Sequence, residues 1–403
     1  MPLIAPKFWH KNEKLIFGII TIISIVSSFM LIKNPTEILK HAIIDDYIPF
    51  IITLFTLYTL SHGIHINLNS TPSTFVNIIF LAISSVFASI IGTTGAAMLF
   101  LRPFLEMNKD RQSKTHLVIF FIFLVANIGG LLTPLGDPPL LLGYLHGVDF
   151  FWELKNTFFY WFGYISIALG ILYVIDKIIL KKDREFLKKS KINLDISGWI
   201  NVALIIATVV VLFANINFNF FDVPQIFIKN AVLLIFCAVS IYNKKTRHEK
   251  KIDFEPFKEV VRTFFVIFIV IAPVLFILEE NSSEIQKLIT NLSNGNDGTS
   301  VYFWMCSLAS SFLDNAPSYL LFFNVAGGNA NELMHTYPSI LKAISVSSVV
   351  MGAMTYIGNA PNMMIKSIAL KKGIKMPSFV GYMAWSILII LPISFLMVFI
   401  MNL

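Results

Sequence analysis

Residues 133–139 read TPLGDPP and residues 355–361 read TYIGNAP, and each stretch interrupts a long apolar run. The two align without a gap at an offset of 222 residues, which places Gly136 opposite Gly358. Both residue types interrupt helices, because glycine adds backbone freedom and proline lacks an N–H donor. The pair therefore predicts one broken helix in each half of the chain and a repeat that relates the two halves.

A second pair of segments lies at the same offset. Residues 88–100 read ASIIGTTGAAMLF, and residues 310–322 read SSFLDNAPSYLLF. Each has helix breakers near its centre, GTTG in the first and DNAP in the second. We interpret the surrounding apolar stretches, 74–104 and 300–326, as re-entrant hairpins that enter and leave the membrane on one side. Irregular backbone at that depth is tolerated where protein or water covers it.

The composition requires a membrane. Of the 403 residues, 56% are hydrophobic and 14% are charged, whereas soluble domains carry about 25% charged residues. A membrane-spanning helix needs about 20 apolar residues. The predicted spans are 15–32, 47–66, 116–145, 157–180, 199–216, 226–243, 261–279, 340–366 and 380–401. The expected fold class is an all-α integral membrane protein with about nine transmembrane helices and two re-entrant hairpins in two inverted repeats.

The positive charges predict the orientation. With the N-terminus in the cytoplasm and both hairpins re-entrant, 21 of the 31 Lys and Arg residues fall in cytoplasmic segments and four in outer segments. Cytoplasmic loops carry this excess as a rule. We therefore expect a multi-pass protein of the cell inner (cytoplasmic) membrane, with the lipid bilayer as a partner and no nucleic acid. The first hairpin then opens to the cytoplasm and the second to the outside, so the repeats are inverted.

The same pattern divides the chain into four parts. These are an N-terminal span and loop (1–46), the first repeat with its hairpin and broken helix (47–180), connecting spans with basic loops (181–260), and the second repeat (261–403). Glycine- and proline-interrupted segments in corresponding halves are the sequence feature that best locates the binding site of a transporter. These segments are therefore where we expect the residues that bind an ion or substrate.

Two aspartates lie in the interrupted segments. Asp137 is in the first broken helix, and Asp314 is at the tip of the second hairpin. An aspartate at the centre of a spanning helix costs about 2.5–3.5 kcal/mol, so the pair indicates a site for a proton or a metal cation, sodium in particular. The alternative is that each carboxylate caps a half-helix or reaches water.

Further oxygen donors accompany the two acids. The other candidate ligands are Thr93, Thr94, Thr133, Gly136, Asn315, Ser318, Thr355, Gly358, Asn359 and Asn362. Carbonyl, hydroxyl and amide oxygens suit a hard cation, although each Thr or Ser could equally form hydrogen bonds within a helix bundle. No Lys or Arg is expected at the same depth, which argues against a bare multivalent anion as the main substrate.

These motifs resemble those of the ion transporter superfamily. LDNAP at 313–317 is similar to the hairpin signature of D-type sodium/proton antiporters and of arsenite permeases. Together with TPLGDPP and GTTG, it most resembles a bacterial branch of citrate transporters or sodium/proton antiporters, from about residue 45 to the C-terminus. The resemblance implies two inverted repeats whose hairpins and broken helices meet at a midplane site, elevator-type alternating access and frequent homodimers. Sodium/dicarboxylate members carry Ser-Asn-Thr at their hairpin tips, and this chain does not.

Three functions are compatible with these features. The first is antiport, in which sodium and protons compete for Asp137 and Asp314, with no cofactor besides these ions. The second is cation-coupled transport of citrate or another organic anion, whose carboxylates the glycine-rich first tip would bind. The third is an integral membrane enzyme using His62 or His146, for which the chain offers no nucleophile elbow, zinc spacing or phosphate loop. We expect a transporter of small ions or a small molecule, and not an enzyme.

Overall fold

A computed structural model describes residues 6–69, 72–183, 193–213, 225–243, 254–293 and 298–401. The first half contains α1 (Pro6–Leu31), α2 (Pro35–His41), the π-helix η1 (Ala42–Tyr47), α3 (Ile48–His62), β1 (His65–Asn69), α4 (Thr74–Ile91), α5 (Thr93–Met107), α6 (Thr115–Leu124), the 3-10 helix η2 (Ile128–Leu132), α7 (Pro138–Leu145) and α8 (Trp152–Asp183). The second half contains β2 (Asn193–Ser197), α9 (Trp199–Phe213), α10 (Gln225–Tyr242), α11 (Glu255–Glu280), α12 (Ser282–Leu292), α13 (Thr299–Phe312), α14 (Asn315–Val325), α15 (Ala330–His335), α16 (Pro338–Met351), η5 (Gly352–Met354), α17 (Ala360–Lys371) and α18 (Phe379–Met401).

The helices are those of a membrane protein. In the described part of the chain, six helical segments are long and apolar enough to cross a bilayer, among them Pro35–His62 and Phe379–Ile400. Large apolar side chains on outer helices are exposed, such as Met30 at 80% and Phe399 at 81%. A surface of this kind is stable against lipid and not against water. The second span begins at residue 35, earlier than the predicted 47, because α2 and η1 continue into α3.

One element departs from the all-α expectation. Strands β1 and β2 form an antiparallel ribbon in which His65 pairs with Ser197 and Asn69 with Asn193. Both sequences, HINLN and NLDIS, alternate polar and apolar residues, which is the period of a strand and not of a helix. The prediction of a span over 47–66 was therefore wrong at its C-terminal end, and the connecting segment after α8 contains a strand.

Each predicted broken helix is interrupted where glycine and proline occur. The first consists of α6, η2 and α7, and the second of α16, η5 and α17. Proline lies in the first turn of the restarting helix in both, where the missing N–H removes no helical hydrogen bond. The N-cap residues Asp137 and Asn359 share an extended backbone, with φ of −147° and −153°.

The same backbone contact joins each hairpin tip to its broken helix. The N–H of Thr93 donates to the carbonyl of Gly136 at 2.8 Å, and the N–H of Asn315 donates to the carbonyl of Gly358 at 3.1 Å. The donor and the acceptor of the second contact each lie 222 residues after those of the first. The tip of each hairpin is therefore hydrogen-bonded to the interruption of the broken helix that follows it in sequence.

A second contact recurs at the same spacing. The hydroxyl of Thr133 donates to the carbonyl of Ser89, and the hydroxyl of Thr355 donates to the carbonyl of Ser311 at 2.6 Å. Each threonine also accepts a hydrogen bond at 3.2 Å from the backbone N–H two residues later. The two halves thus use equivalent side chains to hold equivalent turns.

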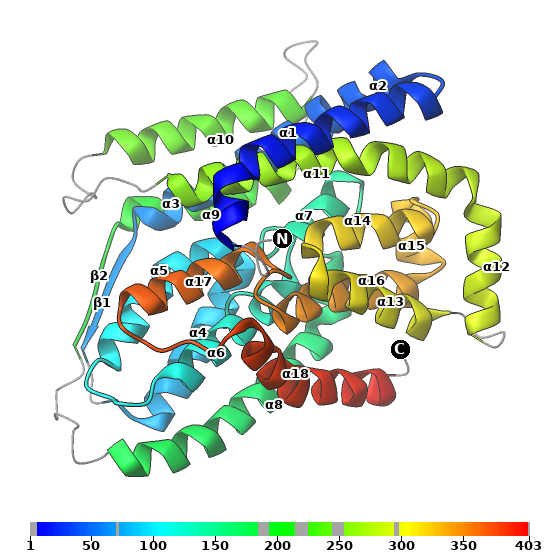
Figure 1. Ribbon diagram of the computed structural model, residues 1–403. Coiled ribbons are helices and arrows are strands. Elements are labelled where there is room, and N and C mark those ends of the chain that lie inside the picture. The colour runs from blue at the N-terminus through cyan, green and yellow to red at the C-terminus, as the bar shows by residue number, and fades with distance from the viewer. Residues whose placement is uncertain are drawn as a thin grey trace.

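The half-helices approach the centre of the molecule from opposite ends (Figure 1). Helices α5 and α17 lie toward the end that carries β1 and β2, whereas α7 and α14 lie toward the end that carries α12. Helix α5 packs against α17, and α7 packs against α14. Helix α6 and η2 are almost wholly buried. The two breaks therefore face each other in the interior.

Candidate ion-binding site

The carboxylate of Asp137 is the centre of the site. Asp137 is 2% exposed, and its side chain does not cap α7. Oδ1 accepts hydrogen bonds from Thr93 Oγ1 at 2.7 Å and from Asn359 Nδ2 at 3.1 Å, and Oδ2 accepts one from Asn315 Nδ2. The three donors come from α5, α14 and the turn before α17. All of them are neutral, and no ion pair of the described residues includes Asp137.

Asn315 contributes an unused acceptor beside this carboxylate. It is the first residue of α14 and is fully buried. Its Nδ2 donates to Asp137, but its Oδ1 has no hydrogen-bond partner. A buried acceptor left without a donor costs about 1–3 kcal/mol. A cation beside Asp137 would satisfy this oxygen as well as the carboxylate.

A chain of amides connects the two breaks. Asn127 Nδ2 donates to Asn362 Oδ1 at 2.8 Å, and Asn127 Oδ1 accepts from Asn359 Nδ2 at 3.3 Å. Asn362 in turn donates to the carbonyls of Gly352 at 2.8 Å and Thr355 at 3.0 Å. Every member is buried, and the network holds the carbonyls of the second break next to Asn359, which contacts the carboxylate.

Glycine allows the backbone to come this close. A Cβ atom on Gly130 would lie 2.8 Å from Thr93 Cγ2 and 2.9 Å from Asp137 Cβ, and one on Gly136 would overlap the Gly130 carbonyl. The link between α4 and α5 needs glycine for another reason, since Gly92 has φ of 81°, a conformation that other residues rarely adopt. These positions explain why the breaks are glycine-rich.

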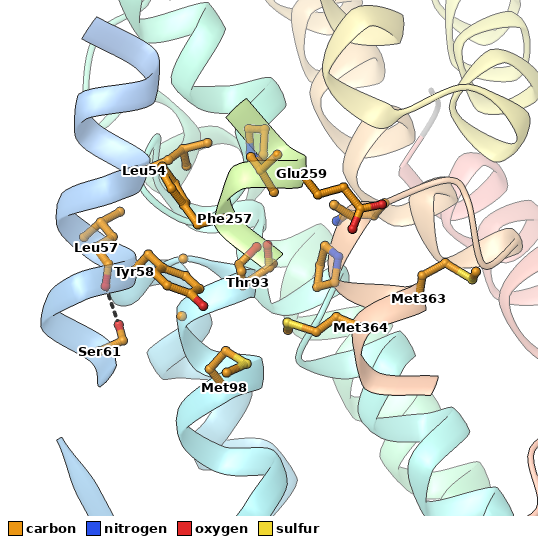
Figure 2. A pocket seen from close by; sticks show the side chains of 18 of the residues that line it. Leu54, Leu57, Tyr58, Ser61, Thr93, Met98, Phe257, Glu259, Met363 and Met364 are labelled. Carbon is orange, nitrogen blue, oxygen red and sulfur yellow. Dashed lines mark hydrogen bonds between the residues drawn. The ribbon is translucent and has the colours of Figure 1, made fainter. Parts of the chain in front are cut away.

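A cavity of about 2110 Å³ borders the site. It is larger than the roughly 300–1,000 Å³ of a typical small-molecule pocket. Thr93 lies in its wall with Tyr58, Met98 and Met364 around it (Figure 2). Asn359 also lines the cavity, so that an ion or small molecule in the cavity would reach two of the residues that hold Asp137.

The second aspartate has a different position. Asp314 is partly exposed to the cavity, and its Oδ1 accepts a hydrogen bond from the N–H of Ala316 at 3.2 Å, which caps α14. No described hydrogen bond connects it with Asp137. Thr94 also lines the cavity without a described bond to the site. The two acids therefore do not share one set of ligands.

The remaining candidates serve the backbone. Thr133 and Thr355 hold the turns described above, and Ser318 donates to the carbonyl of Asp314 at 3.0 Å. Gly136 and Gly358 accept the N–H groups at the hairpin tips. The structure thus brings Thr93, Asp137, Asn315 and Asn359 together directly, with Asn362 behind them.

Asn127 belongs to the site but was not among the predicted ligands. Residue 349, its counterpart at the offset of 222, is Val, so the alignment of the halves gives no signal there. A buried asparagine two residues before a Gly-Gly pair in an apolar run was the available signal. Its energetic cost in that position requires hydrogen-bond partners.

The ligands around Asp137 are of a kind that limits which ions could bind there. Among the described residues, no group of three or more His, Cys, Asp or Glu side chains could hold a metal ion. One carboxylate with neutral amide, hydroxyl and carbonyl oxygens lacks the soft ligands that transition metals select. A set of oxygen ligands alone is compatible with a hard cation or a proton.

A multi-pass helical membrane protein with a polar centre between interrupted helices is of the transporter class. The chain matches a protein-family model described as "putative citrate transport" over residues 1–402, and it belongs to that family. No curated protein matches the chain.

Proposed function

We propose that the protein is a secondary active transporter of the cytoplasmic membrane that exchanges sodium for protons at Asp137. The observation that supports this most directly is the buried carboxylate held by three neutral donors, with the unused oxygen of Asn315 next to it. A carboxylate taken out of water needs a compensating charge. A proton or a sodium ion supplies it, and one group cannot hold both. Competition at a single charged site then couples the two ions.

The architecture supports alternating access. The recurring contacts at a spacing of 222 residues, and the approach of the half-helices from opposite ends (Figure 1), fit two inverted repeats with re-entrant hairpins α4–α5 and α13–α14. In such a fold the site lies between the repeats, and one repeat moves against the other to change the side from which the site is reached.

The cavity indicates which side is open. Its lining continues from Thr93 along α5 to Arg102 and also includes Lys371 and Lys372. The last two belong to a segment that the positive-inside rule assigns to the cytoplasm. We propose that this conformation faces the cytoplasm, with the proton or sodium reaching Asp137 through the cavity.

Transport of citrate with a cation is the second candidate. The family description names citrate, and the cavity is large enough for an organic anion. Its lining includes Arg102, Lys371 and Lys372, which would attract an anion, together with acidic residues such as Glu106 and Glu259. The absence of any cationic partner for Asp137 among the described residues favours the ion exchanger, because a bound citrate would need compensation of its own charges at the same depth.

One assay separates the candidates. Purified protein in liposomes is tested with sodium, lithium, potassium and citrate in parallel, with a proton-sensitive dye inside. We expect sodium-dependent proton movement without citrate and its loss in Asp137→Asn. Citrate accumulation that requires a cation gradient, or full sodium/proton exchange in Asp137→Asn, would contradict the proposal.

A further inference from the structure

A second buried acid lies apart from the ion site. Glu153 is in the first turn of α8, within the loop region 146–156 that the sequence places at the outer surface, yet it is only 1% exposed. Its Oε1 accepts a hydrogen bond from Ser345 Oγ on α16 at 2.9 Å. Its Oε2 is buried and has no hydrogen-bond partner. One half of this carboxyl group is therefore unsatisfied.

A tyrosine with an unused hydroxyl lies beside it. Tyr319 on α14 is fully buried and lies near Glu153 and Ser345, but its hydroxyl makes no hydrogen bond of normal geometry. The hydroxyl occupies space that a side chain at Gly143 on α7 would fill, since a Cβ there would overlap it. Two unused polar atoms, one from Glu153 and one from Tyr319, thus belong to one buried cluster.

No charge compensates an ionised Glu153. Among the described residues no ion pair includes it. The nearest basic residue along α16 is Lys342, one turn before Ser345 and half-buried, and on the α13 side the cluster contains Cys306. The partial positive charge at the start of α8 favours a carboxylate, but neither oxygen of Glu153 accepts a described backbone N–H. Burying an ionised carboxyl group without such compensation is energetically costly.

The cluster adjoins the ion site through two helices. Helix α7 begins directly after Asp137 and reaches Gly143 six residues later, and α14 begins at Asn315 and reaches Tyr319 four residues later. At 1.5 Å of rise per residue these separations are about 9 Å and about 6 Å along the helix axes. A change in the hydrogen bond of Tyr319 therefore acts on the helix whose first residue holds Asp137.

We propose that Glu153 is a second proton-binding site, on the outer side of Asp137, and that Ser345 and Tyr319 are its hydrogen-bonding partners. With the proton bound, Oε2 carries an O–H group, and a small rotation of either side chain would direct it at the Tyr319 oxygen, which has no hydrogen-bond partner in this structure. When the proton leaves to water on the outer side, the Tyr319 hydroxyl turns and donates to the carboxylate. The role of this step in exchange rests on the proposed function, whereas proton binding at Glu153 does not.

Infrared difference spectroscopy of the purified protein in lipid tests proton binding directly. The C=O stretch of a protonated carboxyl is compared in the wild type, Glu153→Gln, Asp137→Asn and the exposed control Glu332→Gln. We expect one such band to disappear in Glu153→Gln and to remain in Asp137→Asn and Glu332→Gln. A wild-type spectrum in which Glu153→Gln removes no protonated-carboxyl band would overturn the proposal, whatever the transport result.

A second measurement distinguishes a proton site from a structural hydrogen bond. Glu153→Gln keeps the hydrogen bond to Ser345 but cannot bind a proton. Because the fold and the site at Asp137 are unchanged in this variant, we expect sodium to raise its unfolding temperature as much as we expect for the wild type. Proton-coupled exchange should fall by about 100-fold, the low end of what a positioned proton-transfer group contributes. Tyr319→Phe should stay folded, because the hydroxyl makes no hydrogen bond in this structure, and it should shift the pH profile of exchange by removing the proposed partner of Glu153. Unchanged exchange rates and pH profiles in both variants would reject a role in transport while leaving Asp137 untouched.

Discussion

At the scale of single residues, Asp137 and Asn359 occupy equivalent N-cap positions in the two halves and differ by one charge. Their side chains touch, because Asn359 Nδ2 donates to Asp137 Oδ1 at 3.1 Å. Either position could thus present a carboxylate to almost the same point. The difference between these two positions lies in their side chains and not in the backbone, whose φ values agree closely.

Transfer of the charge between these positions is therefore testable. We expect saturating sodium to stabilise the wild type by about 2.7 kcal/mol at 100 times the dissociation constant, and to have no effect on Asp137→Asn. In the double variant Asp137→Asn, Asn359→Asp, a carboxylate returns beside the same ligands, and the sodium effect should return in part. Thermal unfolding in detergent with sodium or with a bulky organic cation as control measures this.

We expect the double variant to recover only part of the sodium effect. Asn359 also donates to the carbonyl of Ala126 at 3.0 Å, and an aspartate at 359 would place a negative oxygen against that acceptor. A sodium effect that persists undiminished in Asp137→Asn alone would show that the cation binds elsewhere.

At the scale of elements, the interruptions of the broken helices need glycine where two backbone segments contact each other. A Cβ on Gly358 would lie 2.7 Å from the carbonyl oxygen of Gly352 and 2.8 Å from that of Ser310. Gly358→Ala should therefore destabilise the protein by about 1–3 kcal/mol through overpacking. The matched control is Gly170→Ala in α8, where a Cβ meets nothing within 4 Å. Equal unfolding temperatures for the two variants would contradict the tight crossing.

A buried ionic cluster connects α8 with the loop after the first hairpin and with α6. Asp176 on α8 pairs with Arg111 at 2.6 Å and with His116 at 2.8 Å, and the Arg111 and Asp176 side chains are fully buried. Asp176→Asn leaves Arg111 without its carboxylate, which should destabilise the protein by about 3–5 kcal/mol. The exposed pair Lys109–Glu106 provides the control, because Glu106→Gln should leave thermal unfolding unchanged. A small effect of Asp176→Asn would mean that other partners compensate Arg111.

At the scale of the whole molecule, the sequence analysis located segments that align at one offset and missed residues without a counterpart at that offset. The breaks, the hairpin stretches and Asp137 followed from segments that align at one offset. Asn127 has Val349 as its counterpart, and Glu153 falls in a predicted loop, so neither had such a signal. The ribbon of β1 and β2 joins two five-residue segments more than 100 residues apart, and such short alternating runs become strands only when the fold brings them together.

The fold of the whole molecule also determines the side of the membrane to which the cavity opens. Its lining reaches from Thr93 through Met98 to Lys371, toward the basic loops. Single cysteines at Lys109 and Asn331, both exposed, lie in segments predicted inside and outside, and Met98→Cys lies in the cavity. The native Cys237 and Cys306 are buried, so unmodified protein supplies the background for labelling.

With a membrane-impermeant maleimide, we expect Lys109→Cys and Met98→Cys to react in inside-out vesicles and Asn331→Cys to react in right-side-out vesicles. The positive-inside rule orients the loops, and the cavity then connects Met98 with the cytoplasm. Reaction of Met98→Cys from the side of Asn331→Cys alone would place the opening on the outer face. Reaction of Lys109→Cys and Asn331→Cys from one side would exclude the crossing pattern on which the inverted repeats depend.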